Sequence, residues 1–418
     1  MDDKYKQTES LSMSVKDQPI ATLLSPTFEE APALCKDKAI AVLMSGGVDS
    51  SVTAMLLRDA GWDGVGITMK IPLVDACSVR RPCCGTDAAL VCRDLGVPHY
   101  FVDTEEAFRV FVVEPFRKAY CEGRTPSPCV DCNTFMKFHF VWNLLRDRLG
   151  VFHLATGHYA RIDRATDEMP PRLRRAKDTD RDQSYFLYGA PRDRLAFLHF
   201  PLGELTKTEV RQLASSRGIF VAAKPDSMEL CFAAQGDYRE LLRDAPSQHG
   251  PIRDTSGNVL GEHEGIHNFT VGQRQGLGVS SSQRLYVTKL VPEDHMVVVG
   301  PREAGYETRV RVGEVNVLQP EKLCPGMRLM GKVRSVGSPE PCIVTDVSDD
   351  TKAGSSSRST SVAEDRGPTN LGLEVDFDPP VFAPAPGQHL VLYDDDDAVV
   401  AGGVITRERE GGYSDGGR

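Results

Sequence analysis

Three things are scarce in this 418-residue sequence: long hydrophobic runs, an excess of positive charge, and targeting signals. No apolar run approaches the roughly 18 residues that a membrane span needs, which excludes a membrane protein. Acidic residues number 59 against 49 lysines and arginines, for a net charge of −10. A protein that coats duplex nucleic acid without specificity is normally basic. Any nucleic-acid partner must therefore be bound by a local basic surface.

No secretory signal peptide is present, and residues 1–38 hold acids and lysines but no arginine, unlike a mitochondrial or plastid transit peptide. Eleven cysteines at irregular spacings do not suit the disulfide framework of a small secreted protein. We therefore expect a reducing compartment, the cytoplasm first, with a mitochondrion or plastid as the alternative. The thiols are then available for chemistry or for metal binding.

The composition, with 40% hydrophobic and 26% charged residues, is typical of a globular protein. The length of 418 residues suits two or three domains. Residues 1–38 lack periodicity and are predicted to be a disordered tail. In residues 39–234 short apolar runs alternate with helical patterns, which predicts an α/β domain with a parallel sheet. The expected strands are 39–44, 65–69, 99–102 and 151–155, and the expected helices are 50–59, 86–95, 105–120 and 133–149.

From about residue 235 the apolar runs shorten, and glycine and proline become frequent. We assign residues 235–306 to a small central domain and residues 307–418 to a C-terminal β-barrel. Within the barrel region, residues 349–369 are rich in serine and mixed charges. That composition predicts a low-complexity surface insertion.

The strongest local motif is Ser45-Gly46-Gly47-Val48-Asp49-Ser50-Ser51, between an expected strand and an expected helix. Its glycines allow a tight turn and close approach of a ligand. The N-terminus of the following helix offers free N–H groups and a positive dipole end to a phosphate. A Walker lysine is missing, so transfer of a γ-phosphoryl group is not implied. A glycine-rich turn with a serine cap is the alternative, but the whole motif resembles the PP-loop of ATP pyrophosphatases.

Met69 and the pair Gly157-His158 lie at the ends of two other expected strands. Ligands of open α/β sheets bind at the carboxyl ends of the strands. We therefore assign these residues to the same pocket, with a core methionine and a structural histidine as the alternatives.

Cys129 and Cys132 are three residues apart, just before an expected helix. The helix dipole is expected to lower the pKa of a thiol there and make it reactive; half of a metal site is the second possibility. Cys231 is a third candidate, although spacing alone does not bring it to Cys132. Taken singly, each cysteine also suits a buried small hydrophobe. The cluster Cys77, Cys83 and Cys84 has no second thiol pair at zinc-finger spacing, and we interpret it as a loop feature.

Taken together and in order, these motifs resemble the tRNA-specific 2-thiouridylases. The match runs from about residue 39 to about residue 407 and is interrupted by the insertion. The segments that match are 44–51, 125–138, 155–161, 181–187, 200–207, 224–232 and 270–278. The resemblance implies a PP-loop domain, a small central domain and a C-terminal β-barrel. It also implies an enzyme that uses ATP to thiolate position 2 of the wobble uridine in tRNAs of the Lys, Glu and Gln type.

In such an enzyme the uridine carbonyl attacks the α-phosphate of ATP, which gives an adenylated base and pyrophosphate, and Mg²⁺ neutralises the phosphates. The residues implied to hold ATP are Leu43, Met44, Ser45, Gly46, Gly47, Val48, Asp49, Ser50, Met69 and Gly157.

The resemblance gives the cysteines their roles. Cys231 matches the residue that receives a persulfide from a sulfur-donor protein, and Cys132 matches the nucleophile that releases the sulfur or forms a disulfide with Cys231. Cys129 stands where many members have an aspartate proposed as general acid or base. The change favours an iron–sulfur cluster held by Cys129, Cys132 and Cys231, so persulfide and cluster chemistry both remain open.

The resemblance also implies contacts to tRNA in both halves of the chain. The residues concerned are Ser127, Pro128, Cys129, His158, Arg181, Asp182, Gln183, Arg334, Ser335 and Gln388. Ser335 replaces the aromatic residue usual in the family, which removes a stacking partner beside Arg334. A monomer without membrane association is expected.

Two other functions remain open at this stage. One is a different PP-loop adenylating ligase or amidotransferase that acts on a small molecule. The other is a cysteine-ligated metal or cluster protein whose nucleotide site is regulatory.

Overall fold

The computed structural model describes residues 38–72, 84–167, 169–226, 230–233, 238–243, 248–349 and 371–407. The predictions made for residues 1–37, for Cys77 and Cys83, and for residues 350–369 lie outside these ranges. The chain divides into two compact units. In the described ranges the first unit comprises 38–115 and 128–243, and the second comprises 116–127 with 248–349 and 371–407.

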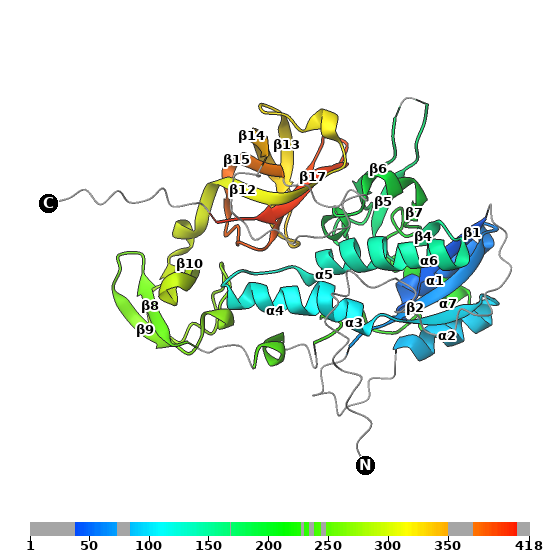
Figure 1. The fold of residues 1–418 in the computed structure, drawn as a ribbon, viewed down its shortest axis with the longest axis horizontal. Helices are drawn as coiled ribbons and strands as arrows, with labels where there is room; N and C mark the ends of the chain where they lie inside the picture. The colour runs from blue at the N-terminus through cyan, green and yellow to red at the C-terminus, as the bar shows by residue number, and fades with distance from the viewer. Residues whose placement is uncertain are drawn as a thin grey trace, which may run out of the picture. The chain divides into compact units, whose positions relative to one another are not determined.

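The first unit is built on a five-stranded parallel sheet, which confirms the predicted α/β class (Figure 1). Its strand order is β3-β2-β1-β4-β7, and every neighbouring pair is parallel. The central strand is fully apolar and almost fully buried, as expected for a parallel sheet. The strands are β1 (Ala39–Leu43), β2 (Asp63–Lys70), β3 (His99–Asp103), β4 (His153–Ala155) and β7 (Leu198–His199).

Helices α1 (Val48–Asp59), α2 (Cys84–Leu95) and α7 (Lys207–Ser216) pack with this sheet. The apolar core between them includes Val52 and Met55 of α1 and Val210 of α7. The start of α7 is set by a capping box, in which the Thr206 side chain accepts from the amide of Glu209. A two-stranded antiparallel pair, β5 (Ala160–Asp163) and β6 (Arg172–Arg175), follows β4.

The helix predicted over residues 133–149 starts earlier than expected, at Pro128. It runs without a break through α5 (Pro128–Asp131), the π-helix η4 (Cys132–Val141) and α6 (Trp142–Leu149). Pro128 suits the first helical position because it has no N–H to leave unpaired. Cys129 and Cys132 thus lie inside the first turns instead of before the helix, and π-helical turns are frequent at functional sites. The predicted helix 105–120 likewise contains a π-helical segment. It consists of α3 (Glu105–Phe108), the π-helix η3 (Arg109–Val113) and α4 (Glu114–Cys121).

The second unit contains a four-stranded sheet and a closed six-stranded barrel, which confirms the predicted β-barrel. The sheet order is β10-β11-β8-β9, from β8 (Gly250–Asp254), β9 (Val259–His263), β10 (Tyr286–Val291) and β11 (Met296–Gly300). The barrel order is β12-β15-β14-β13-β16-β17, drawn yellow to red in Figure 1. Its strands are β12 (Tyr306–Val317), β13 (Arg328–Lys332), β14 (Glu340–Asp349), β15 (Leu371–Phe382), β16 (His389–Tyr393) and β17 (Val399–Ile405). Within the described ranges we find no helix with the length and apolar character of a membrane span.

The barrel buries a histidine that makes its stability depend on pH. His389 is 4% exposed, and burial lowers the pKa of its imidazole from 6.5 to about 3. Between these two values the unfolded chain binds more protons than the folded one, so stability is lost as the pH falls, by at most about 1.4 kcal/mol per pH unit. We expect His389→Gln to flatten the change in urea midpoint between pH 6.5 and pH 4.5. The same substitution at exposed His249 should leave that slope unchanged, and equal slopes for all three proteins would contradict the prediction.

Candidate functional site

The glycine-rich motif forms a turn between β1 and α1 that opens onto the first helical turn. Gly46 adopts a φ of 72°, a conformation that residues with a side chain rarely adopt. Gly47 is the N-cap of α1, and the first helical hydrogen bond runs from the amide of Ser51 to its carbonyl, at 3.3 Å. The amides of the preceding first-turn residues therefore have no helical acceptor. The hydroxyls of Ser50 and Ser51 donate to the Gly47 carbonyl and do not cap the helix. The turn thus has the features of an anion cradle.

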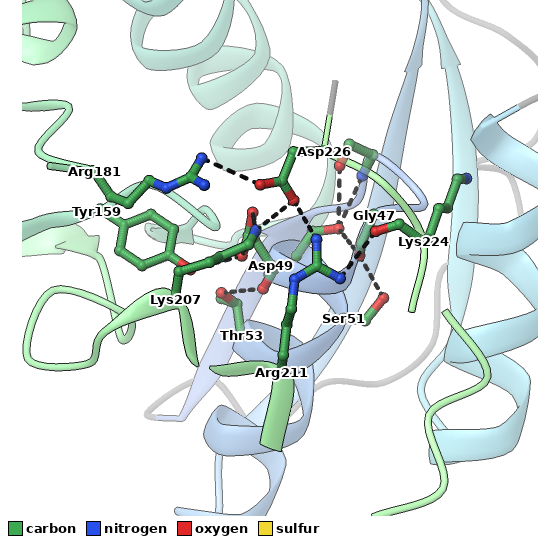
Figure 2. A network of polar contacts seen from close by, with 12 residues as sticks. Gly47, Asp49, Ser51, Thr53, Tyr159, Arg181, Lys207, Arg211, Lys224 and Asp226 are labelled. Atoms are coloured by element: carbon green, nitrogen blue, oxygen red, sulfur yellow. Dashed lines mark hydrogen bonds and ion pairs between the residues drawn. The ribbon is translucent and has the colours of Figure 1, made fainter. Parts of the chain in front are cut away.

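Asp49, in the first turn of α1, is held by two residues from distant parts of the chain. The Tyr159 hydroxyl donates to its Oδ1 at 2.8 Å, and Lys207 Nζ lies 2.9 and 2.8 Å from its two oxygens. Burial, then the charge of Asp49, raise the pKa of Tyr159, so the phenol stays protonated and donates. Figure 2 shows these side chains converging on Asp49.

Lys207 is also paired with Asp226, at 2.7 Å. Arg211 and Arg181 reach the same carboxylate, at 2.8 and 3.2 Å (Figure 2). Burial acts to raise the pKa of Asp226, but the hydrogen bond from Lys207 and the three cations outweigh it and lower the pKa. The carboxylate is therefore ionised at neutral pH.

Gly157 and Met69 lie at the carboxyl edge of the sheet, as predicted. Leu43, the last residue of β1, pairs with Ile67 of β2, so Met69 lies just beyond the end of β1. The Met69 side chain is half-buried. A Cβ on Gly157 would lie 2.8 Å from the Ser50 amide nitrogen, so the chain after β4 packs directly on the start of α1.

Replacing Gly157 with alanine should therefore distort the cradle. The added methyl group would have to push away backbone atoms, and overpacking of this kind typically costs about 1–3 kcal/mol. We expect weaker ATP binding by calorimetry and a lower urea midpoint. Gly64→Ala is the matched control, because its Cβ would meet only Val97 at an ordinary 3.9 Å. Equal ATP affinity in the two variants would contradict the prediction.

The three candidate cysteines lie in the wall of one pocket, of about 160 Å³, in the first unit. Cys129 and Cys132 come from the π-helical stretch, and Cys231 comes from the segment after Asp226. None of the three forms a disulfide. The other lining residues are Phe108, Pro128, Asn133, Lys137, His158, Gln183, Phe186, Leu230 and Phe232.

The expected lowering of the thiol pKa is wrong for this pocket. Burial raises the pKa of Cys129 and of Cys132, and it raises that of Cys231 to about 12. The neighbouring thiols add to the rise at Cys231, while the charge of Lys137 and a backbone hydrogen bond to the Cys231 thiol oppose it. Desolvation by the pocket walls outweighs the charge of Lys137, although the side chains of Cys129 and Cys231 are exposed and that of Cys132 is half-buried. All three thiols are therefore protonated at neutral pH.

His158 and Gln183 line the pocket beside the thiols, and each is oriented by a neighbour. The Nδ1 of His158 lies 2.6 Å from the Thr156 hydroxyl, and burial lowers the pKa of its imidazole well below 6.5, so it is neutral. The side chain of Gln183 accepts from the amide of Tyr159 at 2.9 Å. Asp182, in contrast, is 1% exposed at its side chain and is bonded to Arg175 and to the Ser184 backbone. Its carboxylate supports the segment from inside the fold.

In the second unit, Arg334 and Gln388 have partners of their own. The Arg334 guanidinium lies 5.7 Å from the ring centre of Phe382, so an aromatic neighbour comes from β15 although position 335 is serine. The Gln388 amide donates to the carbonyls of Thr125 and Pro126, at 3.1 and 3.4 Å. Ser127, in the same segment, is 8% exposed.

Sequence reasoning missed Tyr159, Lys207 and Asp226, which surround Asp49. Lys207 and Asp226 lie inside the matching segments 200–207 and 224–232, but nothing in those segments indicates that their side chains meet at Asp49. Only the tertiary contacts, across 110 and 158 residues of chain, identify their common target.

The residues present fit ATP better than they fit a metal cluster. The cradle has glycines where phosphates would approach, unpaired helix amides, and lysine and arginine side chains nearby. Three thiols are a suitable donor set for an iron–sulfur cluster. In the part of the chain that the structure describes, however, no three His, Cys, Asp or Glu side chains are arranged to hold a metal ion. We derive no step through a cluster.

Family models match most of the chain. The tRNA methyl transferase HUP domain matches residues 38–235, the tRNA methyl transferase PRC-barrel domain matches 240–301, and the aminomethyltransferase β-barrel domain matches 359–405. The chain is 41% identical to the tRNA-specific 2-thiouridylase MnmA of Methylobacterium radiotolerans, over 90% of this chain and 96% of that protein. It is 42% identical to the protein of the same name from Methylorubrum extorquens, over 88% and 93%.

Solved structures resemble the chain only distantly. One is the U34-tRNA thiolase NcsA from Methanococcus maripaludis with its [4Fe-4S] cluster, at 17% identity and a TM-score of 0.30, over 53% of this chain and 68% of that one. A likeness of this size adds nothing to the assignment.

Proposed function

The chain belongs to the tRNA-specific 2-thiouridylases, and from this membership we propose how its residues divide the reaction. It is an enzyme that transfers sulfur to uridine in tRNA, which removes the two alternative functions. One observation supports the division of labour proposed below. Residues 157–159 join the cradle to the thiol pocket, because Gly157 packs on α1, His158 lines the pocket and Tyr159 binds Asp49.

We propose that ATP binds with its phosphates on the turn Ser45–Ser50 and its adenosine beside Leu43, Met69 and Gly157. The O2 atom of the wobble uridine attacks the α-phosphorus, the bond to the bridging oxygen breaks, and pyrophosphate leaves. Mg²⁺ would neutralise the phosphate charge. The uridine then carries an AMP group on O2, which turns a poor leaving oxygen into a good one.

In the second half-reaction, a persulfide on Cys231 supplies the sulfur. Its terminal sulfur attacks C2, and AMP leaves with the original oxygen. A thiol of Cys132, once deprotonated, attacks the inner sulfur of Cys231; a Cys132–Cys231 disulfide forms and the thiocarbonyl is released. An external thiol reductant then restores both cysteines. Lys137 supports this role, because its charge is the one that favours the thiolate forms. Cys129, which replaces the usual aspartate, is left as a third thiol beside them.

We propose that neutral His158 and Gln183, with Pro128, contact the uridine base in the pocket, and that Ser127 and Arg181 also contact the tRNA. A base must leave its stack to enter such a pocket. Arg334 and Gln388 would contact the tRNA body from the barrel, with Ser335. Since the overall charge is negative, we expect phosphate contacts from local arginines only.

The reaction needs a protein that delivers persulfide to Cys231. Free cysteines among the described residues suit a reducing compartment such as the cytoplasm. One chain holds both the cradle and the thiols, so a monomer suffices.

Mass spectrometry of tRNA nucleosides tests the function directly. Purified protein, ATP, Mg²⁺, polysulfide and unmodified tRNA should yield 2-thiouridine at the wobble position of Lys, Glu and Gln tRNAs. Iron analysis of the anaerobically purified protein runs beside it: an active, iron-free enzyme supports persulfide chemistry. Activity that requires stoichiometric iron would replace it with cluster chemistry, and absence of thiouridine would overturn the proposal.

A further inference from the structure

Lys207 occupies a position that the two half-reactions share. It is 9% exposed, and its ammonium contacts carboxylates from two separate segments: Asp49 of the cradle, and Asp226, five residues before Cys231. The ring of Tyr159 lies 5.8 Å from the same ammonium. A buried charge costs free energy unless it is fully paired, so this one is kept in place by both acids.

The backbone around Asp226 is tied to the same helix. Arg211 donates to the carbonyls of Ala222 and Lys224, at 2.7 and 3.0 Å, and to the Asp226 carboxylate. The ammonium of Lys224 donates to the carbonyl of Gly46, at 2.9 Å, and lies 2.6 Å from Asp87. Residues 222–226 are therefore fastened to the cradle on one side and to α7 on the other.

We call the contacts of the Lys207 ammonium with Asp49 and Asp226 the bridge. A second ion pair shows that the bridge is not needed merely to hold α1 and α7 together. Asp59, the last residue of α1, pairs with Arg217, just after α7, at 2.8 Å. That pair also joins α1 to α7, but its side chains are 30% and 53% exposed, where such pairs contribute little. Packing of Val52, Met55 and Val210 already joins the helices. The pair at the other end, whose lysine side chain is 11% exposed, lies in the first turn of α1, where the cradle is.

We infer that Lys207 is a positioning residue for both half-reactions: it orients Asp49 for adenylation and, through Asp226, holds residues 222–226, which precede Cys231 in the chain, for sulfur transfer. The inference rests on the proposed function for the identity of the two half-reactions. It assigns separate effects to the two arms of the bridge, which are the Lys207–Asp49 contact and the Lys207–Asp226 contact. Cutting the Asp226 arm should affect sulfur transfer more than adenylation, whereas removing Lys207 should affect both.

Three variants test this, each measured in the full-length protein. Lys207→Met removes the bridge, Asp226→Asn removes the carboxylate charge that Lys207 shares with Arg211 and Arg181 and leaves Asp49 in place, and Arg217→Met removes the exposed ion pair as the matched control. The readouts are tRNA-dependent ATP–pyrophosphate exchange, single-turnover thiolation with polysulfide, the rate of Cys231 alkylation by iodoacetamide, and the melting temperature. Alkylation of the exposed Cys121 serves as the internal reference.

We expect Lys207→Met to lower the exchange kcat at saturating ATP at least tenfold, with partial recovery in Lys207→Arg. Asp226→Asn should lower exchange by less than threefold but thiolation at least tenfold, and change the Cys231 alkylation rate at least threefold. Arg217→Met should leave all three rates unchanged.

Two results would overturn the inference: equal effects of Asp226→Asn on both half-reactions, or Lys207→Met behaving like Arg217→Met. If Lys207→Met does not fold, Asp226→Asn still decides. The alkylation rate needs no turnover, so it tests the bridge even if the wild-type protein fails to thiolate tRNA, a failure that would count against the proposed function instead.

Discussion

Replacing Asp49 with alanine is expected to abolish adenylation, with a loss of roughly 10³-fold in tRNA-dependent ATP–pyrophosphate exchange, or about 4 kcal/mol. Asp49 is the acid of the cradle, and both of its oxygens are occupied by Lys207 and Tyr159. Its removal leaves a buried ammonium with one carboxylate partner in place of two.

The matched control is Asp59→Ala, at the other end of the same helix. Asp59 pairs with Arg217, just after α7, whose side chain is 53% exposed, whereas the side chain of Lys207 is 11% exposed. We expect its exchange rate to stay within twofold of the wild type. If Asp49→Ala retained more than a tenth of the wild-type rate with tRNA and ATP saturating, the cradle assignment would be wrong.

Replacing Cys231 with alanine is expected to separate the half-reactions. Thiolation should fall below detection, because the substitution removes the thiol proposed to carry the persulfide. ATP–pyrophosphate exchange should stay within a few-fold of the wild type, because the cradle residues are untouched. Mass spectrometry of the nucleosides and the exchange assay measure the two rates on one preparation.

Cys121→Ala is the control for general effects of thiol loss, since Cys121 is an exposed free cysteine outside the thiol pocket. It should retain both rates. Loss of exchange together with thiolation in Cys231→Ala would show that the two half-reactions cannot be divided between the cradle and the thiols.

The parallel sheet and the barrel were predictable because both follow from local patterns. Apolar runs such as Ala39–Leu43, followed by glycines and a helical pattern, specify a buried strand and the turn after it. The boundaries of the cysteine helix were less predictable. Its first turns run from Pro128 and pass into a π-helix, and the apolar spacing in the sequence signals neither feature.

The direction of the thiol pKa shifts was not predictable at all. A helix N-terminus favours the thiolate, and the sequence contains that signal at Cys129 and Cys132. The desolvation of these thiols depends on pocket-lining residues such as Phe108, Phe186 and Phe232, which come from three other segments. Burial depends on all of them at once, and it decides the sign.

By itself, the amino-acid sequence determined the fold class and predicted the phosphate-binding turn at Ser45–Ser51, because each depends on residues close together in the chain; the roles of the three cysteines came from the family resemblance. Only the tertiary structure decided that these cysteines share one pocket, that their thiols are protonated, and that Lys207 joins Asp49 to Asp226. The physical reason is range: hydrogen bonds, ion pairs and desolvation act over a few ångströms in space, between residues that lie up to 158 positions apart in the chain.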